Sequence, residues 1–595
     1  MKTIVGSNQE LCVGCNRCIR ACPIEMANLT YEDGDGNIKT KVDDSKCIAC
    51  GACVSACKHG ARFYQDDMDA LLAALAAGER VSLLAAPSLK TNFPKWRNLL
   101  AWLRRQGVEK IYDVSLGADI CIWAHLRHLE RTGQKPLITQ PCPAVVSYCE
   151  VYRPELLAQL SPVHSPMGCA AVYMREYAGV TGTLAALSPC FAKGREFEST
   201  GLVQYNVVFA RLQEHLVKNH IELPDEESGF DHDETGLGAV FPMPGGLKEN
   251  IEFFTGGALR VDRAEGPAVY GLLDEYAGVP AAQLPVVFDV LNCEQGCNIG
   301  PGALRDRSYF EINTAMDTGR RQAVQRCREH YEALHGTYDE RLELSRFMRG
   351  YKPHPEQAPV VTESDIQRAF EVLDKRSYAQ QNYNCGACGC ETCRDMARRI
   401  ALGINIPLNC IVKSRDDTMR EHQRNVAYVG LVHNVAGHLL NTGEREHSRV
   451  VLGAMESLCA AMRANHVSLW KTAEKDGELL IHRLYDWPET GKHTAGIIYE
   501  HQLPDWTDNM RRGIPLYLDR AAATQRDKVL FSDPSTEAFQ LVPLMVKGKY
   551  WGLLSVRFAE THPMNEGEIS VISSIGLLVV SSIMDDEMNR RLIEA

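Results

Sequence analysis

Positive charge is in deficit across this chain of 595 residues, in which 64 Lys and Arg stand against 76 Asp and Glu for a net charge of −12. A domain that binds nucleic acid or an anionic membrane through its charge carries the opposite excess, so neither class is predicted. The opening residues MKTIVGSNQELC contain no apolar signal core, and no uninterrupted apolar run is long enough to span a bilayer. These absences predict a cytoplasmic protein, and the length of 595 residues predicts three to five domains.

Cysteine is the residue in excess. The chain has 22 cysteines, and they are clustered: eight precede residue 60 and five lie between 385 and 410. In a large chain without a signal peptide, tightly spaced cysteines favour metal ligation over disulfides.

The first 66 residues contain two cysteine runs of the same spacing, C-x2-C-x2-C-x3-C, in CVGCNRCIRACP and CIACGACVSAC. Such a run wraps three thiolates around one cubane and sends its fourth cysteine to the neighbouring cubane. The predicted ligands are Cys12, Cys15, Cys18 and Cys57 for one [4Fe–4S] cluster and Cys47, Cys50, Cys53 and Cys22 for the other. This module resembles a bacterial two-cluster ferredoxin, which implies electron transfer. A zinc site is the alternative.

Residues 67–348 alternate short apolar runs with helical stretches, which predicts α/β organisation. Strands are expected at 81–88, 110–115, 135–140, 182–189 and 285–292, and helices at 99–106 and 319–334. Further cysteines follow three of these strands: Cys142 in TQPCPAVV, Cys190 in SPCFAKGREFE, and Cys293 with Cys297 in DVLNCEQGCNIGPG. Ligands collect at the loops that follow α/β strands, so these four thiolates could hold one more cubane.

The three segments resemble the three signature motifs of [FeFe]-hydrogenases in order and rough spacing. The resemblance implies that Cys142, Cys190, Cys293 and Cys297 bind the [4Fe–4S] part of an H-cluster. Cys297 would bridge to a diiron subsite that carries CO, cyanide and an azadithiolate. The resemblance also implies pocket residues: Lys193 donating to a cyanide, Glu196 beside it, Ala86, Pro87 and Ser88 against the other cyanide, and Pro166 with 242–246 as further wall.

The sequence departs from that family where protons are handled. Pro141 stands where the family has a second cysteine, the residue that hands protons to the bridging amine. Ser188 and Leu291 replace two methionines, and His125 and His128 stand near the places of two glutamates. Loss of a positioned acid–base group removes roughly 10²–10⁴ in rate, so slow turnover or altered bias is expected. The two histidines could replace the relay or be ordinary residues of a surface helix. A cubane without a diiron site is a further alternative.

After a proline-rich linker at 349–361, residues 362–420 form a second predicted iron–sulfur unit. Cys385, Cys388, Cys393 and Cys410 have C-x2-C-x4-C-x16-C spacing and resemble the [4Fe–4S] domain of corrinoid iron–sulfur proteins. Its cluster could relay electrons or report redox state, and a zinc knuckle is the alternative. Cys390 is interpreted as a bystander. The thiols that fit no ligand pattern are predicted to be buried and free: Cys121, Cys149, Cys169, Cys327 and Cys459.

A helical connector at 421–444 leads to residues 445–595, which resemble a GAF sensory domain. A hairpin is expected at 542–558, around Lys-Gly-Lys. A helix capped by Asn565 and Glu568 should follow, with Ile572, Ile575, Val579, Ile583 and Met584 on its apolar face. Pairing of flanking helices in that family implies a homodimer.

Together these features predict a multidomain α/β and α+β protein, a sensory-type [FeFe]-hydrogenase of low activity. It would act on H2 and protons, exchange electrons with a partner such as ferredoxin, and signal to a separate output protein. Two alternatives stay open: a catalytic hydrogenase or complex subunit with an unusual proton path, and a non-hydrogenase iron–sulfur protein.

Overall fold

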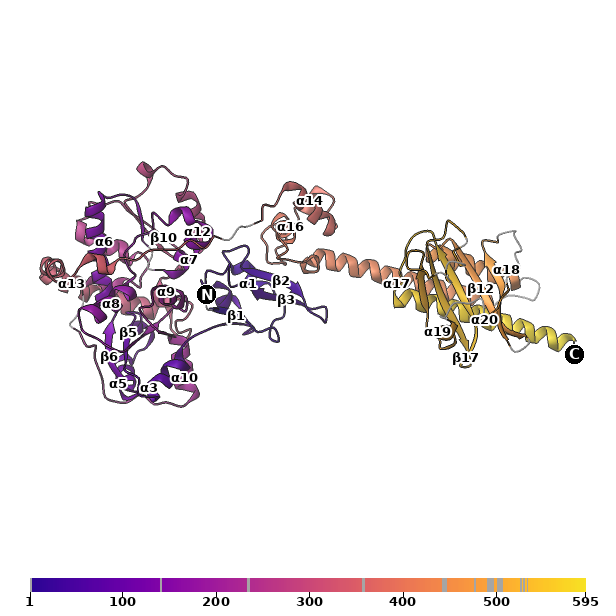
Figure 1. Ribbon diagram of the computed structural model, residues 1–595, viewed down its shortest axis with the longest axis horizontal. Coiled ribbons are helices and arrows are strands. Elements are labelled where there is room, and N and C mark those ends of the chain that lie inside the picture. Colours follow the sequence, from indigo (N-terminus) through magenta and orange to yellow (C-terminus); the bar gives the residue numbers. More distant parts are fainter. Residues whose placement is uncertain are drawn as a thin grey trace. The chain divides into compact units, whose positions relative to one another are not determined.

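The computed structural model describes residues 3–139, 142–232, 236–355, 359–440, 447–475, 478–489, 497–499, 507–524, 527, 530–531 and 533–594. Packing divides the chain into two compact units, Met1–Lys413 and Ser414–Ala595. Figure 1 follows the elements along the chain by colour.

The N-terminal module joins two small antiparallel sheets to two one-turn helices. Strand β1 (Val5–Ser7) pairs with β4 (Arg62–Tyr64), and β2 (Asn28–Glu32) pairs with β3 (Ile38–Val42). Helices α1 (Arg17–Ala21) and α2 (Ala52–Ala56) lie inside the two cysteine runs. Each begins after a left-handed residue, Asn16 with φ 60° and Gly51 with φ 82°, and such a residue turns the cysteine loop back on itself.

The α/β core contains two parallel sheets, with strand orders β6-β5-β8-β9 and β10-β11-β7. Their strands are β5 (Val81–Ala85), β6 (Val108–Asp113), β7 (Leu137–Thr139), β8 (Thr183–Ser188), β9 (Tyr205–Val208), β10 (Val261–Glu265) and β11 (Val287–Leu291). Every residue of β5 and β11 is buried, as expected when helices cover both faces of a parallel sheet. All five predicted strands are confirmed. The sequence did not reveal β9 and β10, and β10 (VDRAE) lacks the apolar run that identifies a buried strand.

In the described part of the core, ten α-helices accompany these sheets: α3 (Met68–Ala76), α4 (Leu89–Asn92), α5 (Trp96–Arg105), α6 (Ser115–Thr132), α7 (Pro143–Tyr152), α8 (Pro166–Glu176), α9 (Lys193–Thr200), α10 (Phe209–Lys218), α11 (Gly246–Thr255) and α12 (Ala268–Tyr276). An eleventh, α13 (Tyr309–Arg341), is longer than the predicted 319–334 because Ser308 and Glu311 form a capping box ten residues earlier.

The second iron–sulfur unit is helical, as predicted. Its helices α14 (Glu363–Val372), α15 (Tyr378–Gln381) and α16 (Cys393–Ala401) each start at a capping box. Helix α17 (Ile411–Leu440) then begins directly after Cys410 and runs through the boundary predicted at residue 420.

The unit Ser414–Ala595 contains one antiparallel sheet of order β14-β13-β12-β17-β16-β15. Its strands are β12 (His466–Lys475), β13 (Glu478–Trp487), β14 (Ile497–Tyr499), β15 (Leu516–Asp519), β16 (Ala538–Val546) and β17 (Lys549–Phe558). Helices α18 (His447–Ala461), α19 (Thr507–Arg511) and α20 (Glu566–Glu594) accompany them. The predicted hairpin is confirmed, since Val546 pairs with Lys549 across the turn. The GAF assignment stays a prediction.

Helix α20 begins at the predicted cap, where Asn565 N donates to Glu568 Oε2 (3.1 Å) and Glu568 N donates to Asn565 Oδ1 (2.9 Å). Ile572 and Ile575 are buried, but Met584 is 38% exposed, so its place on the apolar face was predicted wrongly. By length and composition, Glu566–Leu592 is the one stretch in the described residues that could cross a membrane. Core helices of soluble proteins pass the same test, and this helix supplies core residues to its unit.

Candidate functional site

Three strand ends bring four cysteines together in the α/β core. Cys142 follows β7 and precedes α7, Cys190 follows β8, and Cys293 and Cys297 follow β11. Burial raises the pKa of Cys297 to about 12, with further increases from the neighbouring thiols of Cys142 and Cys190. Burial also raises the pKa of Cys293, and the other three thiols add to that effect. The four predicted ligands therefore share one site at the carboxyl ends of parallel strands.

A buried charged network adjoins the thiols. Lys193 Nζ lies 2.6 Å from Glu196 Oε2 and donates to Ser165 Oγ at 3.1 Å. Ser165 Oγ in turn donates to Glu196 Oε1, and Arg349 Nη1 approaches that oxygen at 3.9 Å. Burial alone would raise the pKa of Glu196, but the charges of Lys193 and Arg349 hold it below its usual value. The charge of Lys193 also lowers the pKa of the thiols of Cys190 and Cys297, so the cysteine site lies within its electrostatic reach.

Ser88 presents a buried hydroxyl that has no hydrogen-bond partner among the described residues. Its Oγ is fully buried and makes no hydrogen bond within the part of the chain that the structure describes. Its carbonyl accepts from Thr91 Oγ1 (2.9 Å) and Asn92 Nδ2 (2.9 Å), and Asn92 Nδ2 also reaches Asn298 O at 3.1 Å. The predicted segment Ala86–Ser88 is thereby tied to the loop of Cys297. Buried hydroxyls are normally hydrogen-bonded, so Ser88 Oγ is available to bond a group held at this site.

These residues fit the predicted cofactor. Thiolates are the ligands of iron–sulfur clusters. A buried ammonium and an unpaired buried hydroxyl suit polar, anionic groups attached to the metal.

Two further segments fix the cysteine turns. Cys190 N donates to Ser188 Oγ (3.3 Å), and Asn206 Nδ2 donates to Cys190 O (3.1 Å). Ser188, one of the departures from the family pattern, therefore supports the Cys190 turn. Cys297 N donates to Pro242 O at 2.8 Å, and a Cβ on Gly296 would lie 2.3 Å from that oxygen. The predicted wall 242–246 thus packs directly on the Cys297 turn, while Pro166 opens α8 beside Ser165.

The predicted proton relay is only partly described, because Gln140 and Pro141 lie outside the described residues. His125 is 3% exposed, so its interpretation as a surface-helix residue was wrong, whereas His128 is half-buried. The imidazole ring of His125 contacts Ser161 Oγ through Nε2 (2.9 Å) and Cys121 O through Nδ1 (2.7 Å). Burial would lower the pKa of His125, but the Cys121 thiol beside it raises it. Cys121, Cys149, Cys169, Cys327 and Cys459 are all buried and free, as predicted.

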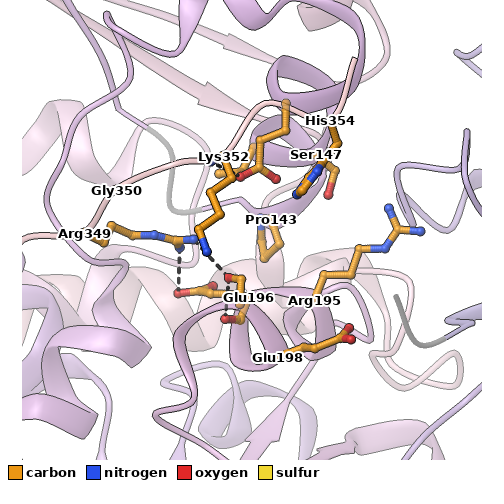
Figure 2. Close-up of a pocket in the computed structure, with 12 residues that line it drawn as sticks. Pro143, Ser147, Arg195, Glu196, Glu198, Arg349, Gly350, Lys352 and His354 are labelled. Carbon is orange, nitrogen blue, oxygen red and sulfur yellow. Dashed lines mark hydrogen bonds and ion pairs between the residues drawn. The ribbon is translucent and has the colours of Figure 1, made fainter. Parts of the chain in front are cut away.

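A charged pocket of about 350 Å³ adjoins this network. Its walls come from α7, from α9 and from the segment that follows α13, and its lining includes Pro143, Glu150, Arg195, Glu196, Arg349 and Lys352. Figure 2 shows Arg349 and Lys352 extending toward Glu196. The sequence did not suggest Arg349 or Lys352, because they lie about 150 residues beyond Glu196 at the start of a predicted linker.

In the N-terminal module the structure brings together one predicted cysteine group in full and two members of the other, Cys12 and Cys18. Burial raises the pKa of Cys50, and the thiols of Cys22, Cys53 and Cys47 add to the effect, so these four lie together. In the other group, Cys12 and Cys18 both approach Thr40 Oγ1, at 3.6 and 3.4 Å. Arg62 Nη2 donates to Cys18 Sγ at 3.2 Å. Cys15 is exposed, and Cys57 ends α2.

The second cysteine loop of this module contacts the α/β core. Asn292, next to Cys293, donates to Cys50 O at 3.2 Å, and Tyr270 Oη donates to Asn292 Oδ1 at 2.6 Å. Arg195 donates to Cys47 O. A Cβ on Gly51 would lie 2.4 Å from Pro301, so only glycine permits this approach. The loop of Cys47 and Cys50 is therefore held directly against the loop of Cys293.

In the second iron–sulfur unit, one cavity is lined by Cys385, Cys388, Cys390, Cys393 and Cys410. The fifth thiol, Cys390, is buried and hydrogen-bonded to Cys388. Cys393 Sγ accepts from Asn384 N at 3.4 Å. The four predicted ligands are thus together, and Cys390 shares their cavity.

Comparison with known families matches three parts of the chain. Residues 70–263 match the iron-only hydrogenase large subunit, C-terminal domain; residues 11–61 match the 4Fe-4S dicluster domain; and residues 381–412 match an Fe-S cluster family.

Iron hydrogenase 1 of Clostridium pasteurianum is 28% identical over 279 residues, which are 40% of this chain and 49% of that protein. The NADP-reducing hydrogenase subunit HndD of Solidesulfovibrio fructosivorans is 24% identical over 291 residues, 41% of this chain and 49% of that protein. The chain thus spans about half the length of these relatives. A solved variant of [FeFe]-hydrogenase HydA1 from Chlamydomonas reinhardtii aligns over 49% of this chain and 100% of its own, at 17% identity and a TM-score of 0.38.

Proposed function

Because this chain is an [FeFe]-hydrogenase-like iron–sulfur protein with a 4Fe-4S dicluster domain and an H-cluster-type domain, we propose that it is an H2-responsive protein of low turnover. The observation that carries the proposal is the convergence of Cys142, Cys190, Cys293 and Cys297 beside Lys193. A bound H-cluster would supply the iron chemistry that forms or splits H2. The chain's own contribution is to ligate it through these thiols, donate to it from Lys193 and offer it the hydroxyl of Ser88.

The low turnover rests on the sequence, which has Pro141 where a proton-transferring thiol is expected. A signalling role rests on the C-terminal unit, a separate compact body whose sheet carries no cysteine cluster among its described residues. Electrons would be exchanged with a partner such as ferredoxin, and a homodimer would pass the state of the cofactor to a separate output protein in the cytoplasm.

A catalytic hydrogenase with a relocated proton path is the second candidate, and His125 is the observation that favours it. This buried imidazole hydrogen-bonds to Ser161, next to a buried thiol, Cys121. Histidine and cysteine can both accept and donate protons near neutral pH. Either residue could therefore carry out the task that Pro141 cannot.

Infrared spectroscopy of anaerobic protein, produced with diiron maturation enzymes, tests the proposal. CO and cyanide bands that shift on addition of H2 are expected. Their absence, when a known hydrogenase matured in parallel shows them, would refute the H-cluster assignment. Pro141→Cys should raise H2 turnover, whereas the matched Pro143→Cys, which places a thiol on the other side of Cys142, should not. Fast turnover by the unmodified protein would favour the catalytic candidate.

A further inference from the structure

The second iron–sulfur unit contacts the first cysteine loop of the N-terminal module through a pair of buried amides. Asn16 Nδ2 donates to Asn409 Oδ1 at 2.6 Å, and Asn409 Nδ2 donates back to Asn16 Oδ1 at 3.3 Å. The two side chains are 7% and 5% exposed. Asn16 follows Cys15, and Asn409 precedes Cys410. The amide pair therefore joins the two loops directly beside two predicted cluster ligands.

The two backbones also touch. Gly389, with φ +84°, packs so closely that a Cβ would lie 3.0 Å from both Asn16 O and Ile19 Cβ. Asn409 Nδ2 reaches Cys388 O at 3.4 Å, and Asn16 Nδ2 reaches Ala387 O at 3.5 Å. Asn16 itself has a left-handed backbone, which asparagine adopts more readily than most residues. Both loops are thus shaped to meet at this point.

Contacts outside the two cysteine loops also hold the N-terminal module against the second iron–sulfur unit. Thr30 N, in β2, donates to Ile404 O at 3.0 Å, which links a strand of the module to the second unit. Arg398 Nε binds Glu25 Oε2 at 3.1 Å, and Arg399 Nη1 donates to Glu25 O at 3.1 Å. The charge of Arg399 also reaches the thiols of Cys22 and Cys388, one in each unit.

We propose that Asn16 and Asn409 are positioning residues of an electron-transfer junction between the N-terminal module and the second iron–sulfur unit. The junction joins the cluster predicted at Cys385, Cys388, Cys393 and Cys410 to the one predicted at Cys12, Cys15, Cys18 and Cys57. One electron leaves the reduced cluster and enters the oxidised one, and no bond is made or broken. Since the other loop of the module contacts the α/β core through Cys47 and Cys50, the second unit forms the outer end of a single electron chain.

The junction extends the proposed function by assigning electron transfer to residues 381–412. It rests on that function in one respect, which is that the [4Fe–4S] clusters must be bound. The junction decides between the two roles predicted for the second iron–sulfur unit, which are electron relay and redox reporting. An electron relay needs the contact with the first cysteine loop of the N-terminal module. A unit that only reported its own redox state to the rest of the chain would not need it.

Asn409→Leu tests whether the Asn16–Asn409 pair holds the second iron–sulfur unit against the N-terminal module. The variant removes both hydrogen bonds between Asn16 and Asn409 and leaves the buried Asn16 Oδ1 without its donor, so opening of the interface should increase about 5- to 150-fold, equivalent to about 1–3 kcal/mol. The Thr30 amide reports this opening by hydrogen exchange. The Asp43 amide, which bonds Ala27 O at 2.9 Å inside the module, should keep its exchange rate. Arg394→Gln is the matched control, since Arg394 bonds Glu363 within the second unit.

Electron paramagnetic resonance of the anaerobic holoprotein, reduced stepwise with titanium(III) citrate, tests the electronic coupling. The unmodified protein and Arg394→Gln should show spin–spin broadening between the two reduced clusters. Asn409→Leu and Gly389→Val should lose it at unchanged iron content. Broadening that persists in both variants, or Thr30 exchange that rises without any loss of broadening, would overturn the junction. The reductant replaces H2, so a failure of H2 reactivity does not affect the result.

Discussion

Glu196→Gln removes the one carboxylate that pairs with both Lys193 and Arg349 in the buried network. The side chain of Glu196 is 4% exposed and that of Lys193 is 11% exposed, so water replaces the lost carboxylate only in part. Glutamine retains an oxygen that can accept from Ser165 but has no charge. The variant therefore removes one counterion from two buried cations.

Removing one partner of a buried ion pair costs about 3–5 kcal/mol. The retained hydrogen bond from Ser165 places this variant near the lower limit, about 3 kcal/mol. A domain of a few hundred residues loses roughly 2–4 °C in midpoint per kcal/mol, so the transition of the α/β core should fall by roughly 6–12 °C. Glu198→Gln is the matched control, because Glu198 lies two residues further along α9 and is exposed. Glu198→Gln should change the free energy of unfolding by no more than about 0.5 kcal/mol.

The effect should also depend on pH in a defined direction. Burial alone would raise the pKa of Glu196, but Lys193 and Arg349 outweigh it and lower the pKa. A carboxyl whose folded pKa lies below its unfolded value, about 4.3, stabilises the fold above that value. This stabilisation disappears as the pH falls through the folded pKa. The difference between Glu196→Gln and the unmodified protein should thus be complete at pH 7 and shrink below about pH 4.

Anaerobic differential scanning calorimetry of holoprotein with verified iron content, at one scan rate and several pH values, measures both effects. Two results would refute the reasoning. One is an equal loss of stability in Glu196→Gln and Glu198→Gln at pH 7. The other is a loss in Glu196→Gln that stays constant as the pH falls below the pKa of the carboxyl.

Two further predictions concern the cluster loops. Arg62→Met removes the donor to Cys18 Sγ and a buried positive charge, so the midpoint potential of the cluster at Cys12, Cys15 and Cys18 should become more negative in a potentiometric titration. The exposed Arg17→Met should leave it unchanged, and equal shifts would contradict the role of Arg62. Cys388→Ala should lose the cluster of the second unit, whereas Cys390→Ala should keep its iron; the reverse outcome in iron analysis would make Cys390 the ligand.

Local sequence patterns predicted the structure correctly wherever a single stretch of chain determines its own conformation. The apolar runs of β5 and β11 predicted buried strands because both faces of a parallel strand are covered. Asn565 and Glu568 predicted the start of α20, since a capping box closes within one helical turn. Cysteine spacing likewise grouped Cys22 with Cys47, Cys50 and Cys53, because a cubane needs one ligand from the distant run.

Contacts between distant segments could not be predicted. Nothing near Arg349 in the sequence indicates that it approaches Glu196, and nothing near Asn16 indicates Asn409. His125 was misjudged for a similar reason. Its own helix offers polar neighbours, such as Arg127 and Glu130, that suggest a surface, whereas its burial depends on α8 and the Ser161 segment packing over it.

The features retained and lost at the site have different physical roles. In the proposed function, Cys142, Cys190, Cys293, Cys297 and Lys193 would hold a cofactor and set its electrostatic surroundings, and these are equilibrium properties of a rigid frame. A relay at position 141 would act only on the rate of proton delivery. Under the proposed function, a frame that has proline at the place of a rate-setting thiol suits a protein that equilibrates with H2 better than one selected for fast turnover. His125 decides how far this argument extends: if His125→Ala abolishes the residual turnover while the infrared bands still shift with H2, the relay has moved rather than disappeared.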